Sequence, residues 1–511
     1  MIRLHLVLLL AVSAVTASAQ TPPALTLTLE QALAMAEQRS ETIAIARTGI
    51  DRADADIARA RSGRRPQLSA SVSFDRSLAS EFEGVFDNFG GGAPGGPGAP
   101  AEGEEIDLPF GRENTWRLAL SLSQSLYSGG RFAAQDAVAA AGQQSAAQAV
   151  TTARAQLLFD VTQAYYDAAL SDRMVAIAEA TLGQAEATLR QVEASFQAGV
   201  QPEFELLRAR VTRDTQNPAI IRQRVNREIA LLRLKQLLDL PANAEVRLAE
   251  SLMDSTLPPP APFATRVAAA ESLALRDVPA AGQASVRTAI EEAMTAVTLQ
   301  EASLALTQAQ GRPSVSLTSN YGRVTYPSGP VWGFSALRTN WTIGASLQIP
   351  LLTGGRQQAD ERTTEANVEA ARIRLRQVEK MAELDRQTAL AELLAARATW
   401  DATAGTVQQA GRAYEIADVR YRAGVSTQLE LADSRLLLQQ SEANRAQAAR
   451  DLQVARARIA LLPNLPIGTG APGGAPRMPP ATPAPQQAPA AGGGARVAAA
   501  PQGGQGFGGG Q

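Results

Sequence analysis

Glu430 and Asp433 are the residues of this sequence whose types and spacing come nearest to a chemical site. They lie three residues apart, shortly after an Ala-Gly-Val turn at 423–425, and on a helix this spacing places both carboxylates on one side. Grouped carboxylates attract cations and can select among the ions that pass them. An ordinary solvated helix face also presents such charge pairs. The spacing alone therefore leaves both interpretations open.

Composition excludes most other chemistry. The 511 residues include no cysteine and one histidine, His5, so we expect neither thiol catalysis nor a cysteine or imidazole metal site. There is no phosphate-binding GxxxxGKS/T loop. The formal net charge is −2, without the basic footprint of a nucleic-acid-binding protein. We expect no enzyme, no cofactor, no metal and no nucleic-acid partner.

The first 19 residues have the pattern of a secretory signal peptide. Arg3 precedes an apolar run over 4–15, and small residues at 17–19 form a cleavage site that leaves Gln20 as the first mature residue. The run is too short for a membrane anchor. No later stretch reaches 18 apolar residues, so the mature chain is expected to enter a membrane, if at all, as a closed β-barrel.

Three landmarks recur at one constant offset along the chain, which indicates an internal duplication. A fourth, Arg-Pro at 65–66 and 312–313, recurs at a larger offset, so the first repeat contains an additional segment. The excess is a Gly-rich stretch at 84–103, typical of an exposed loop. The three landmarks are LYSGGR at 126–131 and LLTGGR at 351–356, FQAGV at 196–200 and YRAGV at 421–425, and Leu-Pro at 240–241 and 465–466.

Each repeat is expected to form a helix, two strands, a long helix, a turn and a second long helix. Apolar and polar residues alternate in strands of a hairpin at about 66–126 and of another at about 313–350. Apolar residues then follow a 3-4 spacing typical of a coiled-coil seam. The first long helix is predicted at 131–197, and Gly199 and Gly424 are expected to end the long helices as C-cap glycines. We expect a kink at Pro218.

These patterns divide the chain into five parts. They are a signal peptide at 1–19, a first repeat at 20–241, a connector at 242–280, a second repeat at 281–466 and a tail at 467–511. The tail is rich in Gly, Pro and Ala and is expected to be disordered.

Two hairpins supply four strands, too few to close a barrel, and lipid does not tolerate open sheet edges. A dimer would give eight strands, whose interior side chains fill. A trimer would give twelve, wide enough for a pore. We therefore expect a homotrimer with lipid around its barrel and the long helices as a tube beyond it.

The ordered set of features over about 25–466 resembles the TolC-like outer-membrane efflux proteins. It comprises the duplication, the Gly-Gly-Arg entry to each long helix, and an aromatic-x-x-Gly-Val turn followed by an acid. The resemblance implies a trimeric twelve-stranded barrel in the outer membrane and an α-helical tunnel in the periplasm. It also implies a periplasmic adaptor protein and an inner-membrane transporter as partners, in tripartite efflux or type I secretion. It names no transported substrate.

The resemblance also assigns roles at the turns. It implies that Glu430 and Asp433 form rings at the periplasmic entrance, and that Tyr421 and Glu205 form a latch of the closed state. Tyr421 also continues the coiled-coil seam, so simple packing is the alternative. The family often has an arginine where this chain has Ser426, so an arginine link is not expected.

Two other classes of protein share parts of this pattern. A periplasmic adaptor also has a coiled-coil hairpin, but usually one, whereas this sequence has two at a fixed offset. An exported coiled-coil structural protein would explain the heptads but not the strand pairs. A heat-modifiable trimer in the outer-membrane fraction would distinguish the duct from both.

Overall fold

The computed structural model describes residues 25–78, 114–249, 252, 257–274, 287–326 and 337–468. All of them belong to one compact unit, Met1–Thr469. The expected signal peptide at 1–19, the Gly-rich insert at 84–103 and nearly all of the tail at 467–511 lie outside the described residues. Those assignments, like the domain boundaries, remain predictions.

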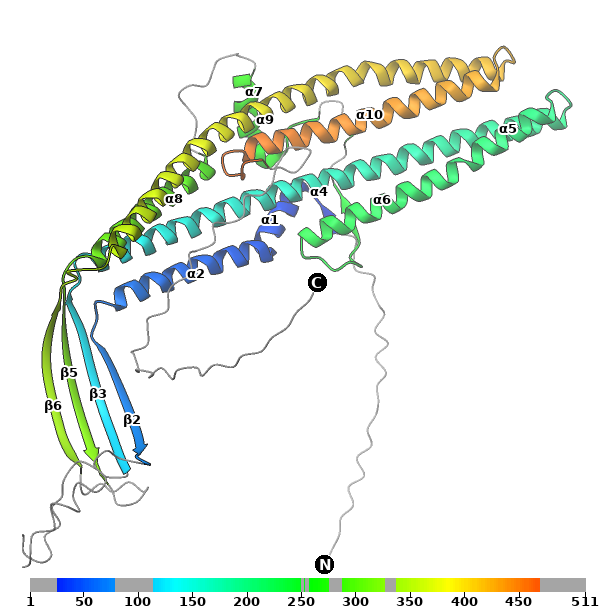
Figure 1. Ribbon diagram of the computed structural model, residues 1–511. Helices are drawn as coiled ribbons and strands as arrows, with labels where there is room; N and C mark the ends of the chain where they lie inside the picture. Colours follow the sequence, from blue (N-terminus) through cyan, green and yellow to red (C-terminus); the bar gives the residue numbers. More distant parts are fainter. Residues whose placement is uncertain are drawn as a thin grey trace, which may run out of the picture. The chain divides into compact units, whose positions relative to one another are not determined.

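A four-stranded antiparallel sheet, in the order β2-β3-β5-β6, joins the hairpins of the two repeats (Figure 1). The contact between the hairpins is the pair β3–β5, so β2 and β6 are the edges, and they run in opposite directions. The prediction of one hairpin per repeat is confirmed. The strands are β2 (Gln67–Arg76), β3 (Asn114–Tyr127), β5 (Ser314–Thr325) and β6 (Arg338–Gln348).

The sheet has one predominantly apolar and one predominantly polar face. Residues directly opposite one another in an antiparallel pair share a face, so the register assigns each residue to a side. Trp341 and Ile343, each 66% exposed, lie on the apolar face of the edge strand β6. The apolar face includes Leu68, Ala70, Val72, Phe74, Trp116, Leu118, Leu120, Leu122, Val315, Leu317, Tyr321, Trp341, Ile343 and Leu347, together with the polar residues Gln124, Ser319 and Arg323. The polar face includes Ser69, Ser71, Ser73, Ser121, Ser316, Thr318, Asn320, Asn340, Thr342 and Ser346, together with Ala119 and Val324.

Two helices of 67 residues continue from the sheet, α4 (Arg131–Gln197) and α9 (Arg356–Arg422). Their bounds repeat the offset that the duplication predicts, and each is on the order of 100 Å long at 1.5 Å per residue. The residues before each helix are two glycines in the left-handed conformation, Gly129 and Gly130 before α4 and Gly354 and Gly355 before α9. These glycines redirect the chain from strand to helix.

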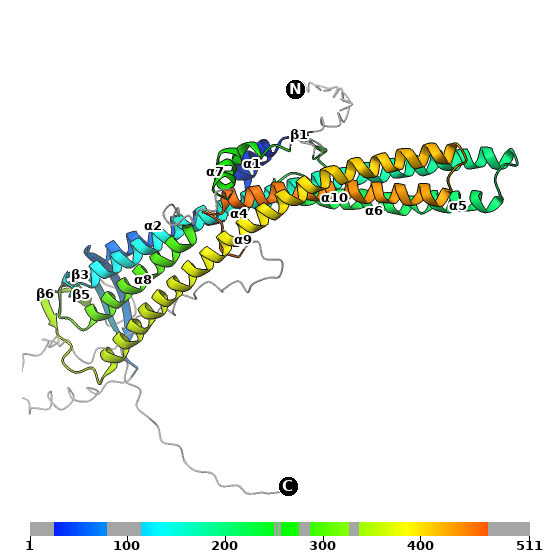
Figure 2. The ribbon, with the colours of Figure 1, turned by 90° about the horizontal axis from the view of Figure 1, so that it is seen from above.

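Shorter helices flank the long ones along their length. Near the sheet, α2 packs beside α4, and α8 packs beside both α4 and α9; toward the far end, α5 and α6 return along α4 and α10 returns along α9 (Figures 1 and 2). The bounds are α1 (Leu29–Arg39), α2 (Glu41–Ser62), α5 (Glu203–Asp214), α6 (Gln216–Leu237), α7 (Ala264–Ala274), α8 (Thr288–Gln310) and α10 (Gln428–Leu461).

The break in the first repeat's returning helix differs slightly from the prediction. It falls at Thr215, between α5 and α6, and Pro218 lies in the first turn of α6. Proline is tolerated there because the first backbone N–H groups of a helix have no intrahelical partner. The corresponding helix of the second repeat, α10, is continuous over 34 residues.

The main hydrophobic core lies midway along the helices, where short parallel strands β1 (Leu25–Leu27) and β4 (Val246–Leu248) pair. Tyr165 of α4 is fully buried there, and its hydroxyl donates to the carbonyl of Leu27 at 3.1 Å. A single-turn 3-10 helix, η1 (Ala261–Phe263), adds Phe263. This core fastens the N-terminal segment and the connector to the long helices.

Beside this core lies a buried charge network. Arg287, at the start of α8, and Arg458 of α10 both pair with Asp385 of α9, at 2.8 and 2.9 Å. The side chains of Arg287, Arg458 and Asp385 are 8%, 6% and 9% exposed. Arg458 also pairs with Glu392, and Arg287 donates to the carbonyls of Ala382 and Leu465. The network ties three helices together where α8 begins.

Replacing Gly129 with alanine should destabilise the protein more than the same change at Gly354. The two glycines have φ of +63° and +61°. An alanine at either position would have to adopt this left-handed conformation, which costs about 1–2 kcal/mol. A Cβ at Gly129 would also lie 2.6 Å from Cβ of Arg312, whereas nothing lies within 4 Å at Gly354. That clash should add roughly 1–3 kcal/mol. Denaturant unfolding of both variants measures the difference, and equal losses would contradict it.

Candidate functional site at the helical turns

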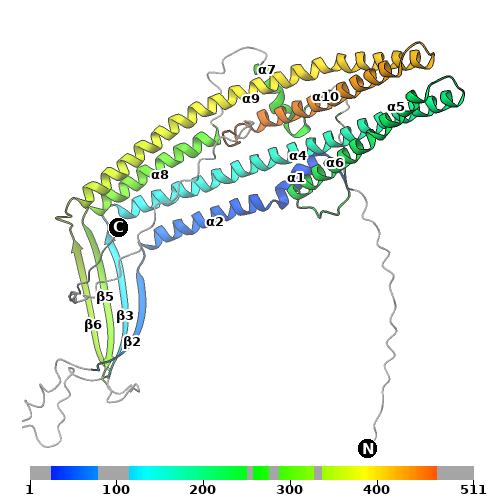
Figure 3. The ribbon, with the colours of Figure 1, turned by 45° about the vertical axis from the view of Figure 1, so that its right-hand side comes forward.

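The two helical turns lie at the same end of the unit, opposite the sheet (Figure 3). Gly199 and Gly424 follow α4 and α9 with φ of +66° and +74°. In each turn the glycine N–H bonds back to the residue three before it, Phe196 or Tyr421, and the next valine N–H bonds to the residue five before it. This is the Schellman motif, which satisfies the last carbonyls of a helix. The C-cap residues of the two helices are Ala198 and Ala423, and the glycines follow them in the left-handed position that ends the helix.

An apolar cluster behind the turns packs the two repeats together. It combines α4 and α5 of the first repeat with α9 and α10 of the second, and Val192 at its centre is fully buried. Because all four helices contribute, the two turns are held as one structural unit. Its members are Leu189, Val192, Leu206, Ala209, Ala417, Tyr421 and Leu431.

Tyr421 belongs to this cluster and is 6% exposed. Its hydroxyl is buried, points toward the first repeat's turn near Gln201 and Glu205, and makes no hydrogen bond of good geometry. Burial raises the pKa of Tyr421, Gln201 opposes that rise, and the charge of Glu205 adds to it. The structure thus brings Tyr421 near Glu205 without bonding the two side chains.

Glu205 instead meets Gln428, the first residue of α10. The side-chain amide of Gln428 is oriented with its nitrogen toward Glu205. It donates to the backbone carbonyl of Glu205 at 3.3 Å and also to the Glu205 carboxylate. Gln428 is 6% exposed, so this contact is shielded from water. It joins α5 to α10 directly, which Tyr421 does not.

Glu430 and Asp433 are both exposed, on one side of the first turns of α10. Thr427 caps this helix by accepting from the N–H of Glu430, and the start of a helix favours acidic side chains. The carboxylate of Glu430 pairs with Arg420 of α9 at 3.0 Å. Asp433 makes no ion pair within the described part of the chain, so its carboxylate is open to solvent.

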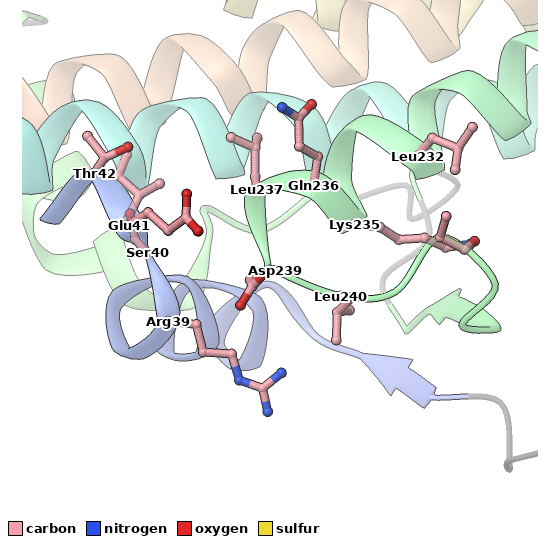
Figure 4. Close-up of a pocket in the computed structure, with 12 residues that line it drawn as sticks. Arg39, Ser40, Glu41, Thr42, Leu232, Lys235, Gln236, Leu237, Asp239 and Leu240 are labelled. Carbon is pink, nitrogen blue, oxygen red and sulfur yellow. The ribbon is translucent and has the colours of Figure 1, made fainter. Parts of the chain in front are cut away.

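A larger cavity, away from the turns, does not bring together side chains that could catalyse a reaction. It measures about 510 Å³ and lies between the α1–α2 junction and the end of α6 (Figure 4). Its charged residues include Arg39, Glu41 and Asp239, and Lys235 is bonded to the carbonyl of Ala242 at 2.9 Å. Among the described residues no group of His, Cys, Asp and Glu could hold a metal ion, and no helix is long and apolar enough to cross a membrane.

Comparison with known proteins decides the family. The model of the family described as outer membrane efflux protein matches residues 32–239 and 284–464, most of the chain. The chain belongs to this family. The two matched segments correspond to the two repeats, so this efflux protein carries the family's sequence features in both halves. The family is one of transport proteins rather than enzymes.

Solved outer-membrane channels share the fold of the efflux protein. The CmeC channel of Campylobacter jejuni is 17% identical, with a TM-score of 0.65 over 86% of each chain. VceC of Vibrio cholerae is 18% identical, also with 0.65, over 85% of this chain and 95% of its own. The open state of Neisseria gonorrhoeae MtrE gives 0.62 at 18% identity, over 86% and 89%. The curated proteins searched contain no match.

Sequence reasoning missed the residues that hold the turns of the efflux protein. Gln428 and Arg420 bond the two acidic residues, Glu205 and Glu430, yet neither stands out by type or spacing. The duplication offers a weak signal for Gln428, because the equivalent residue of the first repeat is Glu203. An acid exchanged for an amide at equivalent positions suggests different partners.

Proposed function

We propose that this efflux protein is the outer-membrane duct of a tripartite efflux assembly and acts as a homotrimer. The observation that carries the proposal is the continuity of a two-faced sheet with two 67-residue helices. An apolar face suits contact with lipid, and a face of Ser, Thr and Asn suits a water-filled lumen. A chain built this way leads solutes from a helical tube to a membrane pore.

The open sheet edges favour three copies. In lipid the unpaired backbone groups of β2 and β6 must be satisfied. The two edges run in opposite directions, so β6 of one copy can pair with β2 of the next in an antiparallel ladder. Three four-stranded sheets give a twelve-stranded barrel, wider than the eight-stranded barrels that side chains fill.

The turns are the end that would meet the partners. Val200 and Val425, at the tips of the two turns, are 77% and 68% exposed although both are apolar. Exposed apolar residues at a projecting end suit protein contact. In the proposed assembly a periplasmic adaptor binds there, and an inner-membrane transporter delivers the substrate to the tunnel.

Glu430 and Asp433 are the proposed selective residues of the periplasmic entrance. In a trimer each would form a ring of three carboxylates, which attracts cations and disfavours anions. We assign the closed contact between the two turns to Glu205 with Gln428, in addition to Tyr421 beside Glu205. The ion pair of Arg420 with Glu430 instead joins α9 to α10 within the second turn. Opening would separate α10 from α5 and break the first contact.

The proposal predicts a cleaved, outer-membrane trimer. The mature N-terminus should lie near Gln20, and the protein should migrate as a heat-modifiable trimer from the outer-membrane fraction. N-terminal sequencing and gel migration before and after boiling measure both properties. A soluble periplasmic monomer would refute the proposal and favour an exported coiled-coil protein, whereas an intact N-terminus would refute the processing alone.

A further inference from the structure

Arg435 of α10 is a buried cation without an acidic partner. Its side chain is 8% exposed, and it makes no ion pair or hydrogen bond within the described part of the chain. Burial lowers the pKa of Arg435, and the ionisable group that acts on it most is the Tyr414 hydroxyl of α9. An arginine remains protonated even so. A buried charge without a partner is destabilising unless something neutralises it.

The equivalent arginine of the first repeat has the partner that Arg435 lacks. The equivalent residue of the first repeat is Arg210, which is half exposed and pairs with Glu193 at 3.6 Å. The equivalent of Glu193 is Asp418, but Asp418 pairs with Arg422 at 2.7 Å instead. The second repeat therefore retains the cation in a more buried place while its carboxylate is engaged elsewhere.

A second arginine lines the same space. Arg208 of α5 and Arg435 line a small cavity between α4, α5 and α10, and Arg208 also makes no ion pair within the described residues. The remaining lining carries hydroxyl and amide groups but no carboxylate. The lining residues are Ala185, Thr188, Arg208, Ala209, Thr212, Gln428, Leu431, Ala432 and Arg435.

The size of the cavity limits its occupant. The space open to the centre of a water-sized sphere is about 10 Å³, close to the minimum that holds one water molecule. A phosphate, a sulfate or a carboxylate side chain is too large for this space without rearrangement. A single-atom anion fits so small a volume, and its charge offsets one of the two positive charges there.

We propose that Arg208 and Arg435 bind a halide ion, physiologically chloride, inside each protomer. The ion bridges the first repeat's α5 to the second repeat's α10, and it does for Arg435 what the carboxylate of Glu193 does for Arg210 in the first repeat. The site includes Gln428 in its lining and lies between α4, α5 and α10. A bound ion would therefore hold the turn of the first repeat to the turn of the second. This inference concerns ion binding by one chain and does not depend on the proposed transport function.

The test uses the full mature protein purified in detergent. Its Tm is measured at constant ionic strength while gluconate, which is too large for the cavity, is replaced stepwise by chloride. We expect a saturable rise in Tm for the parent, and loss of that rise in Arg208→Gln and Arg435→Gln. Arg210→Gln is the matched control, because it removes the equivalent exposed arginine, and it should retain the full rise.

Crystals soaked in bromide provide a second, direct measurement. One anomalous peak per chain is expected between the guanidinium groups of Arg208 and Arg435. If Arg435→Gln does not fold, the parent crystal and the half-buried Arg208→Gln variant still decide the question. A water molecule without anomalous signal at this position, or an equal chloride effect in the parent and in Arg208→Gln, would overturn the proposal.

Discussion

Replacing Asp385 with leucine is expected to destabilise the protein by about 3–5 kcal/mol, the usual cost of removing one partner from a buried ion pair. The change leaves Arg287 and Arg458, which are 8% and 6% exposed, without the carboxylate that both contact. Arg458 retains Glu392, but Arg287 retains only backbone carbonyls. Denaturant unfolding followed by helical circular dichroism measures the loss.

Glu383, two residues earlier on α9, provides the matched control. Hydrogen bonds from Arg386 and Gln387 lower the pKa of Glu383 to about 2, yet its side chain is 52% exposed. Solvent screens such a pair, so Glu383→Gln should cost less than about 1 kcal/mol. A combined replacement of Arg287, Asp385 and Arg458 by apolar residues should recover much of the loss, because no buried charge then remains. Equal effects of the Asp385 and Glu383 changes would contradict a stabilising network.

Replacing Glu430 with glutamine and Asp433 with asparagine is expected to abolish most of the cation preference of the channel. In the proposed trimer the change removes six carboxylates from the entrance, and with them the attraction for cations. Block by divalent cations should weaken in parallel, since both effects have the same electrostatic cause. Single-channel recording in planar bilayers, with reversal potentials in asymmetric salt, measures both.

The control variant loses the same number of negative charges, but at positions away from the turns. Glu365→Gln with Glu379→Gln removes the same two charges from exposed positions on α9, far from the turns. It should leave selectivity close to that of the parent. If the Glu430 and Asp433 variant discriminates ions as the parent does, these residues are a solvated helix face and not the constriction.

Regular patterns made much of the fold predictable. The bounds of the first long helix followed from the Gly-Gly pair before it and the Gly-Val turn after it, and that helix runs over Arg131–Gln197. The duplication then located its equivalent, α9. Local backbone chemistry was less predictable, as the break at Thr215 rather than at Pro218 shows.

The contacts of the candidate site could not be predicted in the same way. Glu205 and Gln428 belong to different repeats, and Arg287 and Asp385 to different helices, so no local periodicity relates the members of either pair. Their meeting depends on how the helices of the two repeats pack, which the sequence of either repeat does not specify. Even the duplication misleads here, because Arg210 and Arg435 are equivalent in sequence but differ in burial and partners.

Closure of one barrel by three copies can be tested by disulfide formation between sheet edges. The chain has no cysteine, so introduced cysteines report only on each other. Ser69→Cys in β2 can be combined in turn with Thr342→Cys, Gly344→Cys or Ser346→Cys in β6, all on the polar face. Within one chain these edges are three strands apart, roughly 14 Å, too far for a disulfide.

Oxidised outer membranes are then run on a denaturing gel without reductant. We expect at least one cysteine pair to give a ladder of linked chains that ends at three, and each single cysteine to give monomers. Reduction should return the ladder to monomer. Monomers alone from every pair, a ladder that ends at two, or one that continues beyond three would contradict a closed trimeric barrel.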